Sequence, residues 1–421
     1  MSTLITGTPH AVELANRQTL KGLRRRWALV AAVFVATVLG GAWLLRAQWS
    51  ADYAQRWLLI AGIIVARELW LLWHGLASNH RADEARLLPT LGHGNRLTIA
   101  RGLMLALLAG FIFSPRPPGW LAWLPAILYT IAAVLDHLDG YVARITNHST
   151  KLGEMLDMEY DVIGIFAAVL LAISYGQLPV WYLGIGLARE IFLAGHWLLR
   201  KSGKPVYDLP PSSDRRLIAG LQMGFLSVVL WPVLAPPVTT VGAVLFALPM
   251  VVSFGRDWMV TSGAWDAASP EYMRRRRRAK ALLEQWLPLV ARIVGTILAV
   301  GLLWRAGPAF TVWQTTLGVG PGVLWAWVGV TVAATALFAL GVAGRAAALV
   351  LVAAACLDSA AYGFSWAHNA WLLVCAIFVL EFGSGRGALW APEEELLRRR
   401  AGERPDAEAG AQTGERESSA S

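Results

Sequence analysis

Charged residues are scarce in this chain. Asp, Glu, Lys and Arg together make up 15% of its 421 residues, whereas about 25% is usual in a soluble globular domain. Hydrophobic residues make up 56%, and the mean hydropathy is +0.49. This depletion of charge, combined with long apolar runs, excludes an ordinary soluble domain and indicates a polytopic membrane protein. The 21 Trp residues agree with that class, because indole rings favour the membrane–water boundary.

Cysteine is almost absent as well. Cys356 and Cys375 are the two in the chain, both lie in apolar runs, and no C-x2-C spacing occurs. The sequence therefore predicts neither a zinc site nor a disulfide framework. No small-residue cleavage pattern follows the first apolar run, which argues against a cleavable signal peptide.

Apolar windows of the ~20 residues needed to cross a bilayer occur about twelve times. They lie near residues 27–46, 57–77, 96–114, 119–142, 155–175, 178–199, 217–235, 238–256, 286–304, 323–342, 346–363 and 368–383. A helix pairs its own backbone groups, as a spanning segment in lipid must. The expected fold class is therefore an all-α polytopic membrane protein with about twelve transmembrane helices.

The net charge of +9 is unevenly placed along the chain. If the spans alternate across the membrane, nearly all basic clusters fall on one side, and the segments on the other side are short and almost uncharged. The clusters are Arg24–Arg26, Arg200 with Lys201 and Lys204, Arg215 with Arg216, Arg274–Arg278 and Arg398–Arg400. The positive-inside rule then predicts that both termini face the cytoplasm. It also favours membrane anchoring over nucleic-acid binding as the meaning of these basic runs.

Composition divides the chain into five segments. Residues 1–89 hold two spans and an interfacial segment, 90–260 hold six spans, and 261–285 form a basic cytoplasmic linker. Residues 286–390 hold about four further spans, and the polar tail 391–421 is predicted to be disordered.

The stretch "AAVLDHLDGYVARITNHSTKLGEMLDMEYDVIG", residues 132–164, places four carboxylates between apolar segments. Asp136 and Asp139 share a helix face at i, i+3, and Asp157 and Asp161 share one at i, i+4. The short link between the two helices lets them run antiparallel, so the pairs can meet at the cytoplasmic ends. An Asp at the bilayer centre costs about 2.5–3.5 kcal/mol. We therefore expect a cation among these four side chains.

Oxygen-only ligands suit hard cations such as Mg²⁺ or Mn²⁺. Four carboxylates can hold two such ions about 3.5–4 Å apart, an arrangement that favours phosphoryl chemistry. Small residues nearby leave room for a ligand to approach the backbone. Gly140 and Ala143 are the small residues on the first helix, Gly153 precedes the second pair, and Arg144 offers a fork for phosphate oxygens.

The complete pattern, D-x2-D-G-x2-A-R-x8-G-x3-D-x3-D, resembles the signature of the CDP-alcohol phosphotransferase family. The resemblance covers about residues 90–260 and implies a six-helix core with a site that faces the cytoplasm. It implies transfer of a substituted phosphate from a CDP-linked donor, often CDP-diacylglycerol, to an alcohol, with release of CMP, in phospholipid biosynthesis.

The resemblance also implies roles for individual residues. Two divalent cations would be held by Asp136, Asp139, Asp157 and Asp161. Asp161 would in addition take the proton of the alcohol. The cytidine diphosphate would be lined by Gly140, Ala143 and Arg144, with Gly153 nearby.

Two further groups of residues are candidates for binding the substrates. The stretch "GNRLTIARGL", residues 94–103, resembles the start of the family's first core helix. By this resemblance, Asn95, Thr98 and Arg101 would lie near the nucleotide. Helix capping and interfacial anchoring are the alternative roles for these residues. Downstream, the acceptor's phosphate would be bound by four basic side chains, Arg189, Lys204, Arg215 and Arg216. The alternative is that they form a structural ion pair and anchor the chain at the cytoplasmic side of the membrane.

Met158 and Val162 occupy places where family members that make phosphatidylglycerol phosphate often have Pro and Lys. A glycerol-phosphate acceptor is therefore in doubt, and the acceptor stays open.

The expected partners are CDP-diacylglycerol or another CDP-alcohol, the alcohol acceptor and the bilayer, with no nucleic acid. The expected location is a prokaryotic-type cytoplasmic membrane. The oligomeric state is left open, and a homodimer is one of the states considered. Three alternatives remain: head-group transfer from CDP-choline, CDP-ethanolamine or CDP-inositol to a lipid alcohol, an ion-coupled polytopic transporter, and an inactive metal-binding scaffold. Residues 286–390 faintly resemble DoxX-type four-helix membrane proteins.

Overall fold

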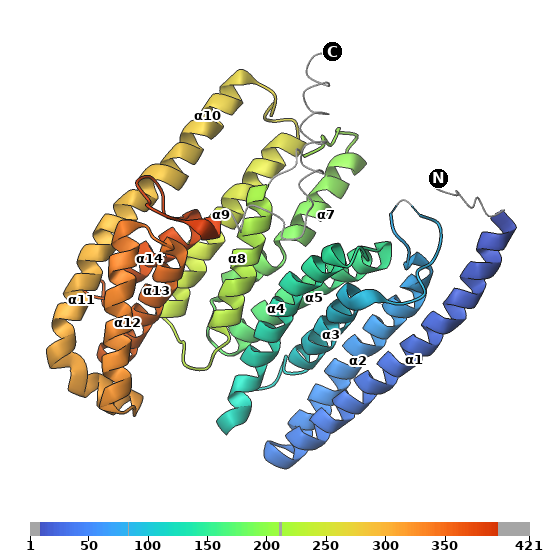
Figure 1. Ribbon diagram of the computed structural model, residues 1–421, viewed down its shortest axis with the longest axis horizontal. Helices are drawn as coiled ribbons and strands as arrows, with labels where there is room; N and C mark the ends of the chain where they lie inside the picture. Colours follow the sequence, from blue (N-terminus) through green and yellow to red (C-terminus); the bar gives the residue numbers. More distant parts are fainter. Residues whose placement is uncertain (1–8, 83, 210–212, 395–421) are drawn as a thin grey trace, which may run out of the picture. The chain divides into compact units, whose positions relative to one another are not determined.

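The computed structural model describes residues 9–82, 84–209 and 213–394, and within these ranges the regular elements are helices (Figure 1). Among these described residues, seven helical stretches are long and apolar enough to cross a membrane, and α14 (Ala370–Phe382) is a shorter apolar helix. The predicted fold class, an all-α polytopic membrane protein, is confirmed. The described chain divides into two compact units, residues 9–175 with 226–232 and residues 176–225 with 233–394.

The first unit is a bundle of five long helices. They are α1 (Pro9–Gln48), α2 (Ala51–Gly75), α3 (Gly92–Ala109), α4 (Leu124–Ile145) and α5 (Lys151–Ser174), with short 3₁₀ turns at Leu76–Ser78 and Gly119–Trp123. α3 is the central helix, because it packs against α4, α5 and α2. Its side chains are buried along most of its length.

Local sequence explains where the two helices that carry the carboxylates begin. α4 starts with Pro125 in its first turn, where a missing N–H does no harm. α5 starts after Thr150, whose side-chain oxygen accepts a hydrogen bond from the Gly153 N–H at 3.1 Å. This cap satisfies one of the free amides of the first turn.

The N-terminal hairpin of α1 and α2 is attached to α3 and α5 by polar contacts. The Trp57 indole donates to the Leu107 carbonyl at 3.0 Å, which ties α2 to α3. The Lys151 N–H donates to the His80 carbonyl at 3.1 Å, at the start of α5. Arg67 of α2 forms an ion pair with Glu159 of α5. The hairpin therefore supports the helix that bears Asp157 and Asp161.

The second unit contains the remaining helices. They are α6 (Leu183–Gly186), α7 (Ala188–Lys201), α8 (Ser213–Val229, of which residues 226–229 belong to the first unit), α9 (Val238–Thr261), α10 (Pro270–Ala281), α11 (Leu287–Leu317), α12 (Pro321–Leu340), α13 (Gly344–Tyr362) and α14. Helices α11 to α14 pack together as a four-helix group. Arg292 of α11 is buried and donates to the carbonyls of Phe338 and Ala339, in the last turn of α12, and to the carbonyl of Ser384, just after α14.

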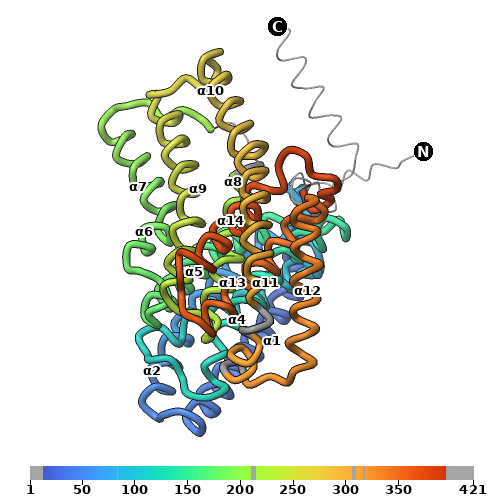
Figure 2. Tube along the Cα trace, turned by 90° about the vertical axis from the view of Figure 1, so that its left-hand side faces the viewer, coloured from blue at the N-terminus to red at the C-terminus, as the bar shows by residue number. Residues whose placement is uncertain are grey.

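All twelve apolar windows predicted from the sequence fall on helices, although the number of membrane crossings stays a prediction. Within the window 178–199, the chain turns at Leu187 and α6 and α7 are separate helices. The predicted linker 261–285 includes the helix α10, which leads through a π-helical turn (Leu282–Trp286) into α11 (Figure 2). The predicted disordered tail lies, from residue 395 onward, outside the described residues.

Candidate active site

Three of the four carboxylates singled out in the sequence converge in the first unit. One carboxylate oxygen from each of Asp136, Asp157 and Asp161 lies within 4.8 Å of the other two. Asp136 comes from α4 and the other two from α5, so the antiparallel arrangement predicted for these helices brings their acidic residues together. Their side chains are 20%, 48% and 44% exposed, respectively, so the cluster is accessible from outside the protein.

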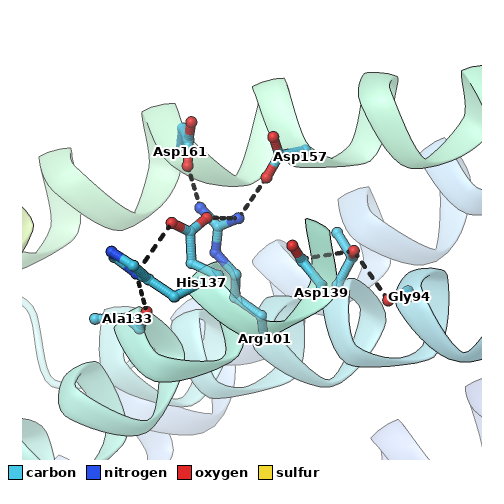
Figure 3. A network of polar contacts seen from close by, with 9 residues as sticks. Gly94, Arg101, Ala133, His137, Asp139, Asp157 and Asp161 are labelled. Atoms are coloured by element: carbon cyan, nitrogen blue, oxygen red, sulfur yellow. Dashed lines mark hydrogen bonds and ion pairs between the residues drawn. The ribbon is translucent and has the colours of Figure 1, made fainter. Parts of the chain in front are cut away.

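A guanidinium group occupies the centre of this cluster. Arg101 of α3 is 1% exposed, and its Nη1 lies 2.5 Å from Asp136 Oδ1 and 2.7 Å from Asp157 Oδ1. Its Nη2 forms an ion pair with Asp161 (Figure 3). One positive charge thus faces three carboxylates, which leaves a net charge of −2 (three minus one) if all are ionised.

The residual negative charge of the cluster and its carboxylate oxygens, as metal ligands, fit a divalent cation. All the side-chain donors of the cluster are carboxylate oxygens, which are ligands that Mg²⁺ and Mn²⁺ prefer. The exposure of Asp157 and Asp161 gives such an ion a path to them. A metal site is therefore consistent with the residues present.

The fourth carboxylate, Asp139, is turned toward α3. It accepts a hydrogen bond from the Thr98 hydroxyl at 2.7 Å, and this hydroxyl also lies 3.3 Å from the Gly94 carbonyl (Figure 3). Asp139 is 6% exposed and does not belong to the group of three. The structure therefore separates the four acidic residues into a cluster of three and one that is bound to α3.

Asn95 and Gly153 occupy a junction between α3 and α5. The Asn95 amide donates to the Thr150 hydroxyl at 2.9 Å and lies 3.4 Å from Asn79 Oδ1. A Cβ added at Gly153 would lie 2.5 Å from Asn95 Oδ1, closer than real Cβ contacts allow. The absence of a side chain at residue 153 thus serves helix packing in this structure.

The two small residues of α4 have different surroundings. Ala143 packs against Gly94, where an added Cβ would lie 2.7 Å from the Ala143 Cβ, so α3 and α4 approach closely here. At Gly140 the nearest atom to an added Cβ is Arg144 Nη1 at 3.1 Å, the end of a flexible side chain. Gly140 and Arg144 are therefore neighbours on α4, and their role in binding a nucleotide stays a prediction.

The basic residues predicted to bind the acceptor all lie in the second unit. Arg189 and Lys204 are exposed, Arg215 Nη1 lies 3.4 Å from Asp257 Oδ2, and Arg216 is on the first turn of α8. They do not form part of the carboxylate cluster within the first unit, and their role stays a prediction.

Sequence comparison identifies the family. The family model for CDP-alcohol phosphatidyltransferase matches residues 92–260. A CDP-diacylglycerol–glycerol-3-phosphate 3-phosphatidyltransferase of Rickettsia bellii is 31% identical over 138 residues, which are 32% of this chain and 72% of that protein. The chain belongs to the CDP-alcohol phosphatidyltransferase family. The resemblance inferred from the Asp pattern is thereby confirmed.

Other members of this family match shorter parts of their own length. A CDP-diacylglycerol–glycerol-3-phosphate 3-phosphatidyltransferase of Cereibacter sphaeroides is 33% identical over 88 residues, 20% of this chain and 39% of that protein. Cholinephosphotransferase 1 of Danio rerio is 30% identical over 163 residues, 35% of this chain and 42% of that protein. The chain thus spans about two fifths of the length of these two relatives. No solved structure matches the chain significantly.

Arg101 lies among the carboxylates, whereas the sequence predicted it to lie near the nucleotide and predicted metal ions as the cations of the cluster. The signal was present in the spacing of Thr98 and Arg101, which are one helical turn apart and both contact acidic residues of the motif. The CDP-alcohol phosphatidyltransferase motif alone does not identify the helix that provides the positive charge beside its Asp residues.

Proposed function

We propose that this protein transfers a substituted phosphate group from a CDP-linked donor to an alcohol, with release of CMP. The observation that carries the proposal is the convergence of Asp136, Asp157 and Asp161 on one guanidinium, in a region that matches the CDP-alcohol phosphatidyltransferase family. CDP-diacylglycerol is the donor that we favour, because the site lies on helices of a membrane protein, where acyl chains can remain in lipid.

Two Mg²⁺ or Mn²⁺ ions are the proposed cofactors, held by the three clustered carboxylates together with Asp139. When bound, such ions neutralise phosphate oxygens and stabilise the charge that develops during phosphoryl transfer. Asp139 would have to exchange its hydrogen bond with Thr98 for a metal bond. Arg101 would remain beside the carboxylates and limit their mutual repulsion.

The chain's own residues supply the acid–base chemistry and the positioning. The acceptor hydroxyl oxygen attacks the donor phosphorus, the bond from this phosphorus to the CMP oxygen breaks, and the hydroxyl proton passes to the Asp161 carboxylate. Asp161 is suited to this role because its side chain is 44% exposed within the cluster. Arg144 would bind diphosphate oxygens through its planar fork, with Gly140 leaving space beside it.

The other predicted residues enter the proposal in supporting positions. Asn95, Thr98, Ala143 and Gly153 hold α3 against α4 and α5; we propose that they shape the wall of the nucleotide site. Acceptor binding is assigned, as before, to four basic side chains: Arg189, Lys204, Arg215 and Arg216.

We further propose that residues 90–260 form the catalytic domain, preceded by the helices of residues 1–89 and joined by the linker 261–285 to a separate membrane domain at 286–390. The active site and both termini would face the cytoplasm of a prokaryotic-type cell, because the basic clusters lie on the side of the membrane predicted to be cytoplasmic. The faint DoxX-like character of residues 286–390 stays a prediction.

Head-group transfer from CDP-choline or CDP-ethanolamine to a lipid alcohol is the second candidate. It is favoured by the match to Cholinephosphotransferase 1, which covers 163 residues, more than the 88 matched to the Cereibacter sphaeroides relative. The same carboxylate cluster would serve both reactions, since CMP leaves in each.

The test uses the full chain in lipid nanodiscs with Mn²⁺. One arm supplies CDP-diacylglycerol with a panel of water-soluble and lipid alcohols, and the other supplies CDP-choline or CDP-ethanolamine with diacylglycerol. CMP release and the lipid product are both measured. We expect turnover in one arm, and its loss with a chelator.

Glu159→Gln provides a matched control for Asp161→Asn in this assay. Glu159 lies on the same helix between two cluster residues, but it pairs with Arg67 instead of Arg101. Activity should survive Glu159→Gln and disappear in Asp161→Asn. A well-folded protein that releases no CMP with any donor and acceptor would overturn the proposal and favour the transporter or scaffold alternatives.

A further inference from the structure

The loop between α3 and α4 holds an arginine in a rigid setting. Its sequence, "SPRPPG", places Arg116 between Pro115 and Pro117. Proline restricts its own φ and also the backbone of the residue before it, so few conformations are open to this stretch. The side chain of Arg116 is therefore presented by a backbone that loses little entropy when a ligand binds.

Arg116 lies against an aromatic ring, and among the described residues its guanidinium has no anionic partner. Its guanidinium carbon is 4.8 Å from the centre of the Tyr175 ring, at the end of α5. Its Nε and Nη2 atoms are enclosed and have no hydrogen-bond acceptor among the described residues. The hydroxyls of Ser114 and Tyr175 are likewise enclosed, with no hydrogen-bond partner in the described part of the chain.

These groups have one chemical property in common, which is that each can donate a hydrogen bond. An enclosed polar group without a partner costs about 1–3 kcal/mol, and more if it is charged. A single anion with several oxygens can accept from a guanidinium and from hydroxyl groups at once. Phosphate has this geometry, and arginine binds it through two parallel N–H groups.

The position of these groups indicates where the phosphate comes from. Tyr175 follows Asp161 by 14 residues on one helix, so the two lie about 21 Å apart along its axis. Aromatic side chains surround the loop and are exposed: Phe113 by 76%, Trp120 by 55% and Trp123 by 37%. Exposed Trp residues at helix ends are typical of the membrane–water interface.

We propose that Arg116, Ser114 and Tyr175 bind the phosphate of an anionic lipid headgroup, in the leaflet opposite the carboxylate cluster. Arg116 contributes the charge, the Tyr175 ring supports the guanidinium from one face, and the two hydroxyls complete the set of donors. This lipid is bound as a ligand and is separate from the substrates of the proposed transfer reaction. The site does not depend on that reaction.

The test is native mass spectrometry of the full chain in detergent, titrated with phosphatidic acid and, separately, with zwitterionic phosphatidylcholine. Arg116→Gln removes the charge, and Arg116→Lys keeps the charge but removes the fork. The matched control is Arg56→Gln. Arg56 is exposed, lies 5.8 Å from the centre of the Tyr53 ring, and belongs to the end of the unit where Trp57 contacts α3.

We expect the wild-type protein and Arg56→Gln to retain one phosphatidic acid more than Arg116→Gln. The affinity for that lipid should fall about tenfold or more in Arg116→Gln and less in Arg116→Lys, because charge-assisted hydrogen bonds are the strong ones. Tyr175→Phe, which keeps the ring and removes the hydroxyl, gives a second variant if Arg116→Gln does not fold, and it should bind more weakly than wild type.

Three results would overturn the proposal. The first is equal retention of phosphatidic acid by wild type and by a folded Arg116→Gln protein. The second is retention of phosphatidylcholine as strong as that of phosphatidic acid. The third result concerns the source of the anion and is measured in phosphatidylcholine nanodiscs. If inorganic phosphate alone raises the melting temperature of wild type but not of Arg116→Gln, the site binds a soluble anion and the lipid assignment is wrong.

Discussion

Replacing Arg101 by Gln should make the protein's stability depend on divalent cations. Arg101 is the buried positive charge that faces Asp136, Asp157 and Asp161. At 4.8 Å, the upper limit of the distances between their nearest oxygens, two like charges repel by ~0.9 kcal/mol in water and by ~3.5 kcal/mol at an effective dielectric constant of 20. Three such pairs remain without compensation when the guanidinium is removed.

The expected loss follows from burial and exposure together. Breaking a buried ion pair by removing one partner costs about 3–5 kcal/mol. We take the lower end, about 3 kcal/mol, because Asp157 and Asp161 are 48% and 44% exposed and water screens them. This is about a hundredfold change in the unfolding equilibrium, and it corresponds to a drop of about 6–12 °C in melting temperature by the scaling for soluble domains.

Thermal unfolding in nanodiscs, with chelator and with Mn²⁺, measures the effect. In chelator, Arg101→Gln should melt well below the wild type, and Mn²⁺ should stabilise the variant more than it stabilises the wild type. Arg96→Gln is the control, because Arg96 is an exposed arginine on the same helix. If Arg101→Gln melts like the wild type in chelator, or if Mn²⁺ shifts both proteins equally, the charge cluster does not behave as described.

Three further predictions concern neighbouring positions. Gly153→Ala should lower the melting temperature, since its Cβ would lie 2.5 Å from Asn95 Oδ1 and overpacking costs about 1–3 kcal/mol. Gly224→Ala, with no atom within 4 Å of the added Cβ, should not lower it, because Ala is the better helix former. Asp161→Asn should reduce CMP release at least a hundredfold, a general-base contribution being about 10²–10⁴, while membrane insertion is normal; a wild-type rate would contradict the assignment. Burial lowers the pKa of His148 in the folded protein, so the unfolded chain takes up the proton first and stability should fall as the pH drops below about 6.5; melting curves of His148→Gln should lack this part of the pH dependence.

Much of the architecture could be predicted from the sequence. Each apolar window lies on helical structure, although the window 178–199 holds two successive helices, α6 and α7. A helix pairs its own backbone groups, as a spanning segment in hydrocarbon must. The meeting of Asp136 with Asp157 and Asp161 followed from helical spacing and a short antiparallel connection. These features depend on period and length, which a single sequence contains.

Side-chain partners could not be predicted in the same way. Asp139 was grouped with the other carboxylates by helical spacing. Instead it accepts a hydrogen bond from Thr98, because α3 lies against that face of α4. Gly153 was expected to leave room for a ligand, and the space beside it is instead occupied by Asn95. Both outcomes depend on which residues of a third helix face the motif, and this requires the packing of the three helices.

The helix α10 shows a different limit. The segment 261–285, which contains the five arginines Arg274–Arg278, was predicted to be a basic cytoplasmic linker, with no helix assigned to it. In the structure Ser269 caps the helix, accepting from the Tyr272 N–H at 3.2 Å, and Pro270 occupies its first turn. Capping and continuity with α11 override the local charge pattern.

The contacts of α2 with α3 and α5 limit how far the chain can be shortened at its amino-terminal end. Trimming the chain to residues 92–260 would delete Trp57 and Arg67, and leave the Leu107 carbonyl and Glu159 without the groups that now bond to them. A recombinant core designed on the matched segment alone would therefore present a bare flank of α3 and α5 to lipid or to other copies of itself. Laboratories that shorten this protein should keep the amino-terminal hairpin.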